Sequence, residues 1–160
     1  MERLWSPWRM EYIESAREAG SEEGCPFCGL AEDDDRVLAR AGLAFVTLAK
    51  YPYNPGHLLI LPTRHTGDVE DVTTGEHADI ATLLRRAVGA LRATADPGGF
   101  NVGLNLGRVA GAGIPEHLHW HVVPRWGGDT NFMPVVGGTR VLPELLADTY
   151  AKLKPAFDRA

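Results

Sequence analysis

Short apolar runs separated by turn-forming residues predict a set of β-strands. The stretch 43–49, LAFVTLA, and the stretch 57–62, HLLILP, flank the turn sequence YPYNPG. This arrangement predicts two neighbouring antiparallel strands joined by a longer loop. Further strands are predicted over FNVGLNLG, over 117–124 and near 133–136. The strand pattern therefore predicts a sheet of about five strands.

Apolar residues at helical spacing predict three helices. The longest follows Thr73 and Glu76, which have the spacing of a capping box, and DPGG at 96–99 ends it. Its apolar positions fall on one face: Ile80, Leu83, Leu84, Ala87, Val88 and Leu91. Shorter helices are predicted over 7–19 and 142–157. The order of strands, helix, strands and helix predicts an α+β fold with an antiparallel sheet packed under helices.

Composition places the chain among soluble single-domain proteins. We expect one domain over residues 1–160, since this length suffices for a core. The net charge of −5 gives no sign of a nucleic-acid partner, although local basic groups could still bind a polyanionic small molecule. No secretory signal or membrane span is visible, so a cytoplasmic location is expected. A structural disulfide between the two cysteines is not expected there.

The stretch EHLHWHVVPRW holds three of the six histidines of the chain. Side chains on a strand alternate between faces, so His117, His119 and His121 share one face, with neighbours roughly 7 Å apart. The residues between them share the other face and are predicted core: Leu118, Trp120 and Val122. Two chemical interpretations remain, a zinc site built from histidines or a nucleophilic histidine. Three imidazoles along a flat strand cannot all converge on one metal ion.

The sequence around this strand favours chemistry at phosphate. The glycine-rich GRVAGAG precedes it, and backbone amides of such loops can bind anions, although glycine more often serves only to make a turn. Asn105 ends the preceding strand, and Arg108 and Arg125 supply positive charge nearby. A histidine nucleophile beside a phosphate-binding loop indicates phosphoryl or nucleotidyl transfer.

Several stretches together resemble the histidine triad (HIT) family. HLHWHVV fits the family pattern His-φ-His-φ-His-φ-φ, where φ is apolar, and NPGHLLILPTRH and FNVGLNLG resemble two further segments. The similarity covers about residues 25–136. It is closest to the actinobacterial diadenosine tetraphosphate phosphorylase-like branch of fragile-histidine-triad-type proteins. The helices 7–19 and 142–157 would then be additions to a single HIT domain.

The resemblance implies a homodimer and a division of labour within the site. His119 would attack the α-phosphorus of a nucleotide to form a nucleotidyl-histidine, and His121 would contact phosphate and assist the leaving group. His117 would help to arrange the site. Asn105 would hold ribose or phosphate, and the loop amides at Gly111 and Gly113 would donate to phosphate oxygens. Magnesium would enter, if at all, with the nucleotide.

The resemblance leaves the second acceptor open. Phosphate would make the protein a phosphorylase that converts diadenosine tetraphosphate to ADP and ATP. Water would make it a hydrolase of dinucleoside polyphosphates or nucleoside phosphoramidates, and a third possibility is a nucleotide-binding dimer with weak catalysis. Ile114 stands where many members carry Ser or Thr. Trp126 follows Pro-Arg as in the phosphorylase-like branch, either beside the site or packed at the surface.

The CPFC motif holds the only two cysteines. A C-x-x-C pair can be a redox centre or half of a metal site. The redox interpretation needs a following helix, and GLAEDDD is a poor helix sequence. In several HIT proteins, two histidines complete the site, and they correspond here to His65 and His117. The resemblance therefore implies a structural Cys₂His₂ zinc site made of Cys25, Cys28, His65 and His117. His57 is placed on a strand, either near the nucleotide or in a structural role.

Overall fold

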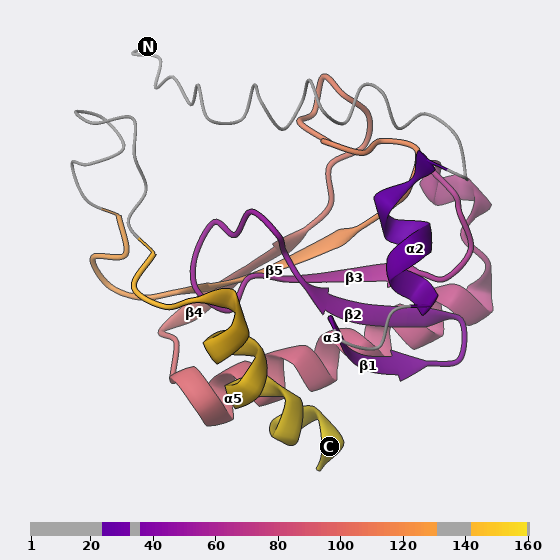
Figure 1. Cartoon of the computed structure of the whole chain (residues 1–160). Coiled ribbons are helices and arrows are strands. Elements are labelled where there is room, and N and C mark those ends of the chain that lie inside the picture. The colour runs from indigo at the N-terminus through magenta and orange to yellow at the C-terminus, as the bar shows by residue number, and fades with distance from the viewer. Residues whose placement is uncertain (1–23, 33–35, 131–141, 160) are drawn as a thin grey trace.

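The computed structural model describes residues 24–32, 36–130 and 142–159, and it contains one antiparallel sheet with helices on both faces (Figure 1). The elements follow one another in this order: α2 (Pro26–Glu32), β1 (Val37–Ala41), β2 (Ala44–Leu48), β3 (Leu58–Pro62), the 3₁₀ turn η2 (Val69–Asp71), α3 (Thr74–Ala95), β4 (Gly99–Gly103), β5 (Trp120–Arg125) and α5 (Leu146–Asp158). The predicted helix 7–19 and the predicted strand 133–136 lie outside the described residues.

The sheet has five strands in the order β1-β2-β3-β5-β4, and every pairing is antiparallel. The predicted α+β class and strand number are confirmed. The pair β2 and β3 keeps an unbroken register from Ala44 opposite Pro62 to Leu48 opposite Leu58. Strand β1 was not predicted, since its sequence VLARA shows no strict alternation and carries an arginine. It pairs with β2 across the turn at Gly42, whose φ of 46° suits glycine.

Helix α3 forms as its sequence predicts. The Thr73 hydroxyl accepts from the Glu76 amide at 3.2 Å, and the Glu76 carboxylate accepts from the Thr73 amide at 2.8 Å. The helix ends at Asp96, which adopts a left-handed conformation with φ of 42°. All six predicted apolar positions of α3 lie in the core or pack against it. Helix α5 begins at Leu146, four residues later than the predicted 142. Pro143 disfavours helical conformation at Leu142, the residue before it.

Two cores lie on opposite faces of the sheet. The larger joins α3 and α5 to one face and includes Leu118, Val122 and Phe157. The smaller joins α2 to the other face and includes Phe27 and Ile114. Figure 1 shows α2 above the sheet and α3 with α5 below it. None of the helices in the described ranges has the length and apolar character needed to cross a membrane.

Candidate active site and metal cluster

The three triad histidines lie on the face of the sheet that α2 covers. By its backbone pairing, β5 begins only at Trp120. His121 therefore lies on the strand, and His117 and His119 lie in the segment that leads into it. The His119 and His121 rings are 5.0 Å apart, and the Phe27 ring of α2 lies 5.6 Å from His117 and 5.1 Å from His119. The residues between the histidines face the opposite core, as predicted: Leu118, Trp120 and Val122.

His119 is held in the form that a nucleophile requires. Its Nδ1 lies 2.9 Å from the carbonyl oxygen of His117. A carbonyl only accepts, so Nδ1 carries the ring proton and Nε2 carries the lone pair. The side chain is 5% exposed, and this burial lowers the pKa of His119 below its ordinary 6.5. His119 is therefore neutral at pH 7, with a basic nitrogen ready to attack.

His121 is held in the opposite tautomer by two successive hydrogen bonds that begin at a backbone amide. The Tyr53 amide donates to His57 Nδ1 at 3.1 Å. His57 Nε2 then carries its proton and donates to His121 Nδ1 at 2.9 Å. A neutral His121 therefore carries its proton on Nε2, which suits a group that protonates a leaving oxygen. The Tyr53 ring stacks on His57 at 4.8 Å. No pattern in the sequence indicates this role of Tyr53.

The four predicted metal ligands come together although 92 residues separate Cys25 from His117. The ligand atoms of Cys25, Cys28, His65 and His117 all lie within 4.8 Å of one another. The Cys28 Sγ to His65 Nδ1 distance is 3.2 Å, and Cys25 Sγ to His117 Nδ1 is 3.4 Å. Zinc bonds of about 2.3 Å to sulfur and about 2.05 Å to nitrogen give a tetrahedral S···N edge of about 3.6 Å. The cluster is thus close to the size that a metal ion needs.

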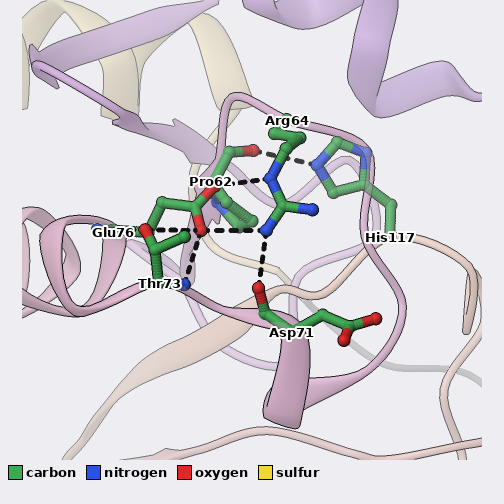
Figure 2. A network of polar contacts seen from close by, with 6 residues as sticks. All are labelled: Pro62, Arg64, Asp71, Thr73, Glu76 and His117. Carbon is green, nitrogen blue, oxygen red and sulfur yellow. Dashed lines mark hydrogen bonds and ion pairs between the residues drawn. The ribbon is translucent and has the colours of Figure 1, made fainter.

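His117 presents the correct nitrogen to this cluster. Its Nε2 donates to the carbonyl oxygen of Pro62 at 2.9 Å (Figure 2), which leaves the Nδ1 lone pair facing the cysteines. His117 is fully buried, and this burial, with smaller contributions from His65 and His119, lowers the pKa of His117 to about 4. The ring is therefore neutral at pH 7, as a metal ligand must be. These contacts place His117 at the metal cluster.

The structure corrects the expectation that GLAEDDD, after the CPFC motif, would not form a helix, because its first four residues belong to α2. Residues 26–32 form α2, with Pro26 at the first helical position, where its missing amide hydrogen costs nothing. Burial of Phe27 and Leu30 in the smaller core stabilises a sequence whose own helix preference is weak. Cys28 lies in the first turn of α2, and both cysteine sulfurs face histidine nitrogens.

The glycine-rich loop is bonded largely to itself. The Gly111 amide donates to the Arg108 carbonyl at 2.9 Å, and the Asn105 amide group lies 3.5 Å from the Gly111 carbonyl. Arg108 forms an ion pair with Glu116 at 2.8 Å, which ties the loop to the start of the triad. In this conformation the Gly111 amide is used within the loop. Phosphate binding by Asn105, Gly111 and Gly113 stays a prediction.

Ile114 and Trp126 differ in how they relate to the histidines. Ile114 is buried in the smaller core, on the same face as the triad. Trp126 lies five residues beyond His121, roughly 17 Å along an extended chain. Its indole N–H donates to the Ala95 carbonyl at 3.1 Å, at the end of α3. The structure therefore does not bring Trp126 to the triad of this chain.

A family model and similar sequences both relate this chain to histidine triad proteins. The model of the HIT domain matches residues 31–128. A Mycobacterium tuberculosis protein named AP-4-A phosphorylase is 43% identical, over 99% of this chain and 86% of its own. A Schizosaccharomyces pombe protein named bis(5'-nucleosyl)-tetraphosphatase (asymmetrical) is 34% identical, over 51% of this chain and 43% of its own.

A solved structure has the same fold. It is a zinc-bound histidine triad family protein from Mycobacterium smegmatis, with a TM-score of 0.69 and 25% identity. The superposition covers 87% of this chain and 96% of that one.

Proposed function

This chain belongs to the HIT family, and we propose on that basis that it phosphorolyses diadenosine tetraphosphate to ADP and ATP. The observation that carries the proposal is the state of His119, which is buried, neutral and fixed with its lone pair on Nε2. The 43% identity to the mycobacterial AP-4-A phosphorylase selects the substrate and the acceptor.

The first step transfers an adenylyl group to His119. Its Nε2 attacks the α-phosphorus, and the bond from that phosphorus to the bridging oxygen breaks, which releases ATP. His121 donates its Nε2 proton to the departing oxygen. The adenylylated ring becomes cationic while Nδ1 keeps its proton. The His117 carbonyl, 2.9 Å from Nδ1, stabilises that charge.

The second step returns the enzyme to its starting state. An oxygen of inorganic phosphate attacks the same phosphorus, and the bond from phosphorus to Nε2 breaks. ADP leaves, His119 becomes neutral again, and His121 takes the proton that the phosphate loses. We assign Asn105 and the Gly113 amide to the substrate phosphates, because their loop leads directly into the triad.

We also propose that the four-residue cluster holds zinc. Two thiolates and two neutral imidazoles are a donor set that zinc prefers, and the sulfur to nitrogen distances of 3.2 and 3.4 Å fit it. Bound there, zinc supplies folding energy rather than chemistry, because four protein ligands close its coordination. His117 would anchor the chain that leads to His119. Magnesium stays a prediction, tied to the nucleotide.

A homodimer is proposed for the active assembly. Strand β4 is the last strand of the described sheet, and its Val102 is 47% exposed, with Leu106 beyond it 48% exposed. An edge strand with exposed apolar side chains is a ready surface for pairing with a second copy. Sedimentation that finds a stable monomer at micromolar concentration would contradict this proposal.

Hydrolysis is the second candidate function, favoured by the 34% identity to the tetraphosphatase. Both reactions use the same nucleophile and differ only in whether phosphate or water attacks the intermediate. A dimer that binds nucleotides with weak catalysis is the third candidate. The neutral His119, with its lone pair on Nε2, argues against it.

Product analysis with diadenosine tetraphosphate separates these functions. With inorganic phosphate we expect ADP and ATP, and without it little turnover. His119→Ala should remove turnover, whereas His77→Ala, at an exposed position of α3, should retain it. AMP and ATP formed without phosphate would establish hydrolysis instead. No turnover by the wild type, with normal nucleotide binding by His119→Ala, would favour the binding function.

A further inference from the structure

The loop that follows β3 contacts the triad segment at both of its ends. At its start, the Pro62 carbonyl accepts from His117 Nε2 at 2.9 Å. At its end, the Thr66 carbonyl accepts from the Leu118 amide at 2.8 Å. Between them lies His65, whose Nδ1 faces Cys28. Residues 62–66 therefore provide one metal ligand and fix the orientation of another.

Arg64, in the middle of this loop, bonds in another direction, toward the start of α3. Its Nε and Nη2 donate to the two carboxylate oxygens of Glu76, each at 3.0 Å, and Nη2 also donates to the Asp71 carbonyl at 2.7 Å. Figure 2 shows the guanidinium bonded to both. This two-pronged geometry fixes the direction of the side chain as well as its distance from the partner.

Glu76 makes this contact rigid. The residue is 3% exposed, and the same carboxylate closes the capping box of α3 through the Thr73 amide. The hydrogen bonds from Arg64 lower the pKa of Glu76 to about 2, so the carboxylate is ionised at neutral pH. A buried carboxylate without its partner would be strongly unfavourable. The loop is thus tied to the first turn of a 22-residue helix.

We propose that Arg64 is a positioning residue that preorganises the metal cluster by tying the 62–66 loop to α3. With Arg64 in place, His65 and the Pro62 carbonyl occupy their positions before an ion arrives. Less ordering is then needed on binding, and the affinity for zinc is higher. The inference rests on the zinc site proposed above. Groups that orient metal ligands typically contribute about 10–100-fold to metal affinity.

The test measures zinc affinity by competition with a chromophoric chelator. Arg64→Met keeps much of the apolar stem and removes the guanidinium group that bonds Glu76. We expect it to weaken zinc binding by about 10–100-fold. Thr73→Ala is the matched control, since it removes the capping hydroxyl of α3 and leaves Arg64 and Glu76 paired. It should lower the melting temperature and bind zinc like the wild type.

Three results would overturn the inference. In the first, Arg64→Met binds zinc as tightly as the wild type. In the second, Thr73→Ala loses as much affinity as Arg64→Met, which would make the effect one of overall stability. In the third, the wild type contains no stoichiometric zinc, which would contradict the proposed zinc site as well. The nucleotidyl chemistry is tested separately by product analysis. If Arg64→Met does not fold, Arg64→Lys replaces it in the same comparison, because lysine keeps the charge but cannot bond both carboxylate oxygens as the guanidinium does.

Discussion

His119 and His121 are the same residue type, two positions apart, and their hydrogen-bond partners give them different chemistry. The His117 carbonyl makes Nδ1 of His119 the protonated nitrogen. The Tyr53 amide, through His57, makes Nδ1 of His121 an acceptor. One ring therefore presents a lone pair and the other a proton, as nucleophile and acid require.

The depressed pKa of His119 predicts how adenylyl transfer depends on pH. Protonation of Nε2 removes the nucleophile, so the rate falls only when the pH approaches the lowered pKa of His119. In single-turnover measurements of intermediate formation, the acid limb should have its midpoint below pH 6.5, the ordinary value for histidine. His77→Ala should give the same profile as the wild type. A midpoint at or above 6.5 would show that burial does not control this residue.

At the scale of residues, sequence patterns predict faces but not protonation. Alternation correctly separated the histidines from Leu118 and Val122. The tautomers depend on where the His117 carbonyl and the Tyr53 amide point, and such backbone directions leave no trace in a residue pattern.

The elements show why some structure was predictable and some was not. Helix α3 carries its own signals, a capping box and one apolar face, and it forms where predicted. Strand β1 and helix α2 lack such signals. They form because they pack on the rest of the fold, β1 against β2 and α2 through Phe27 in the smaller core. Tertiary contacts decide such short segments.

Helix α2 is only seven residues long, which is too short for a helix that is stable by itself. We therefore expect its stability to depend on the metal cluster. Cys25→Ser should lose stoichiometric zinc and melt at a lower temperature than the wild type. The wild type after chelator treatment should melt close to the variant. Metal analysis and thermal melting together check this. Wild-type protein purified without chelator that contains no zinc, with no change in melting for Cys25→Ser, would contradict the prediction.

At the scale of the whole molecule, the two faces of the sheet carry different parts of the protein. One face carries the larger core under α3 and α5, and the other carries the triad, the metal cluster and α2. The metal cluster joins positions that lie far apart in sequence, which no local pattern could predict. The resemblance to the HIT family indicated its four members. Trp126 donates its indole N–H to the end of α3, and its role at the nucleotide stays a prediction.

The central claim is that His119 carries an adenylyl group from diadenosine tetraphosphate to inorganic phosphate. Its most direct test is to mix enzyme and substrate without phosphate, locate the bound adenylyl group by peptide mass spectrometry, and then add phosphate. The account predicts adenylyl on His119, released as ADP when phosphate is added. Adenylyl on no residue, or its release only as AMP, would contradict the account.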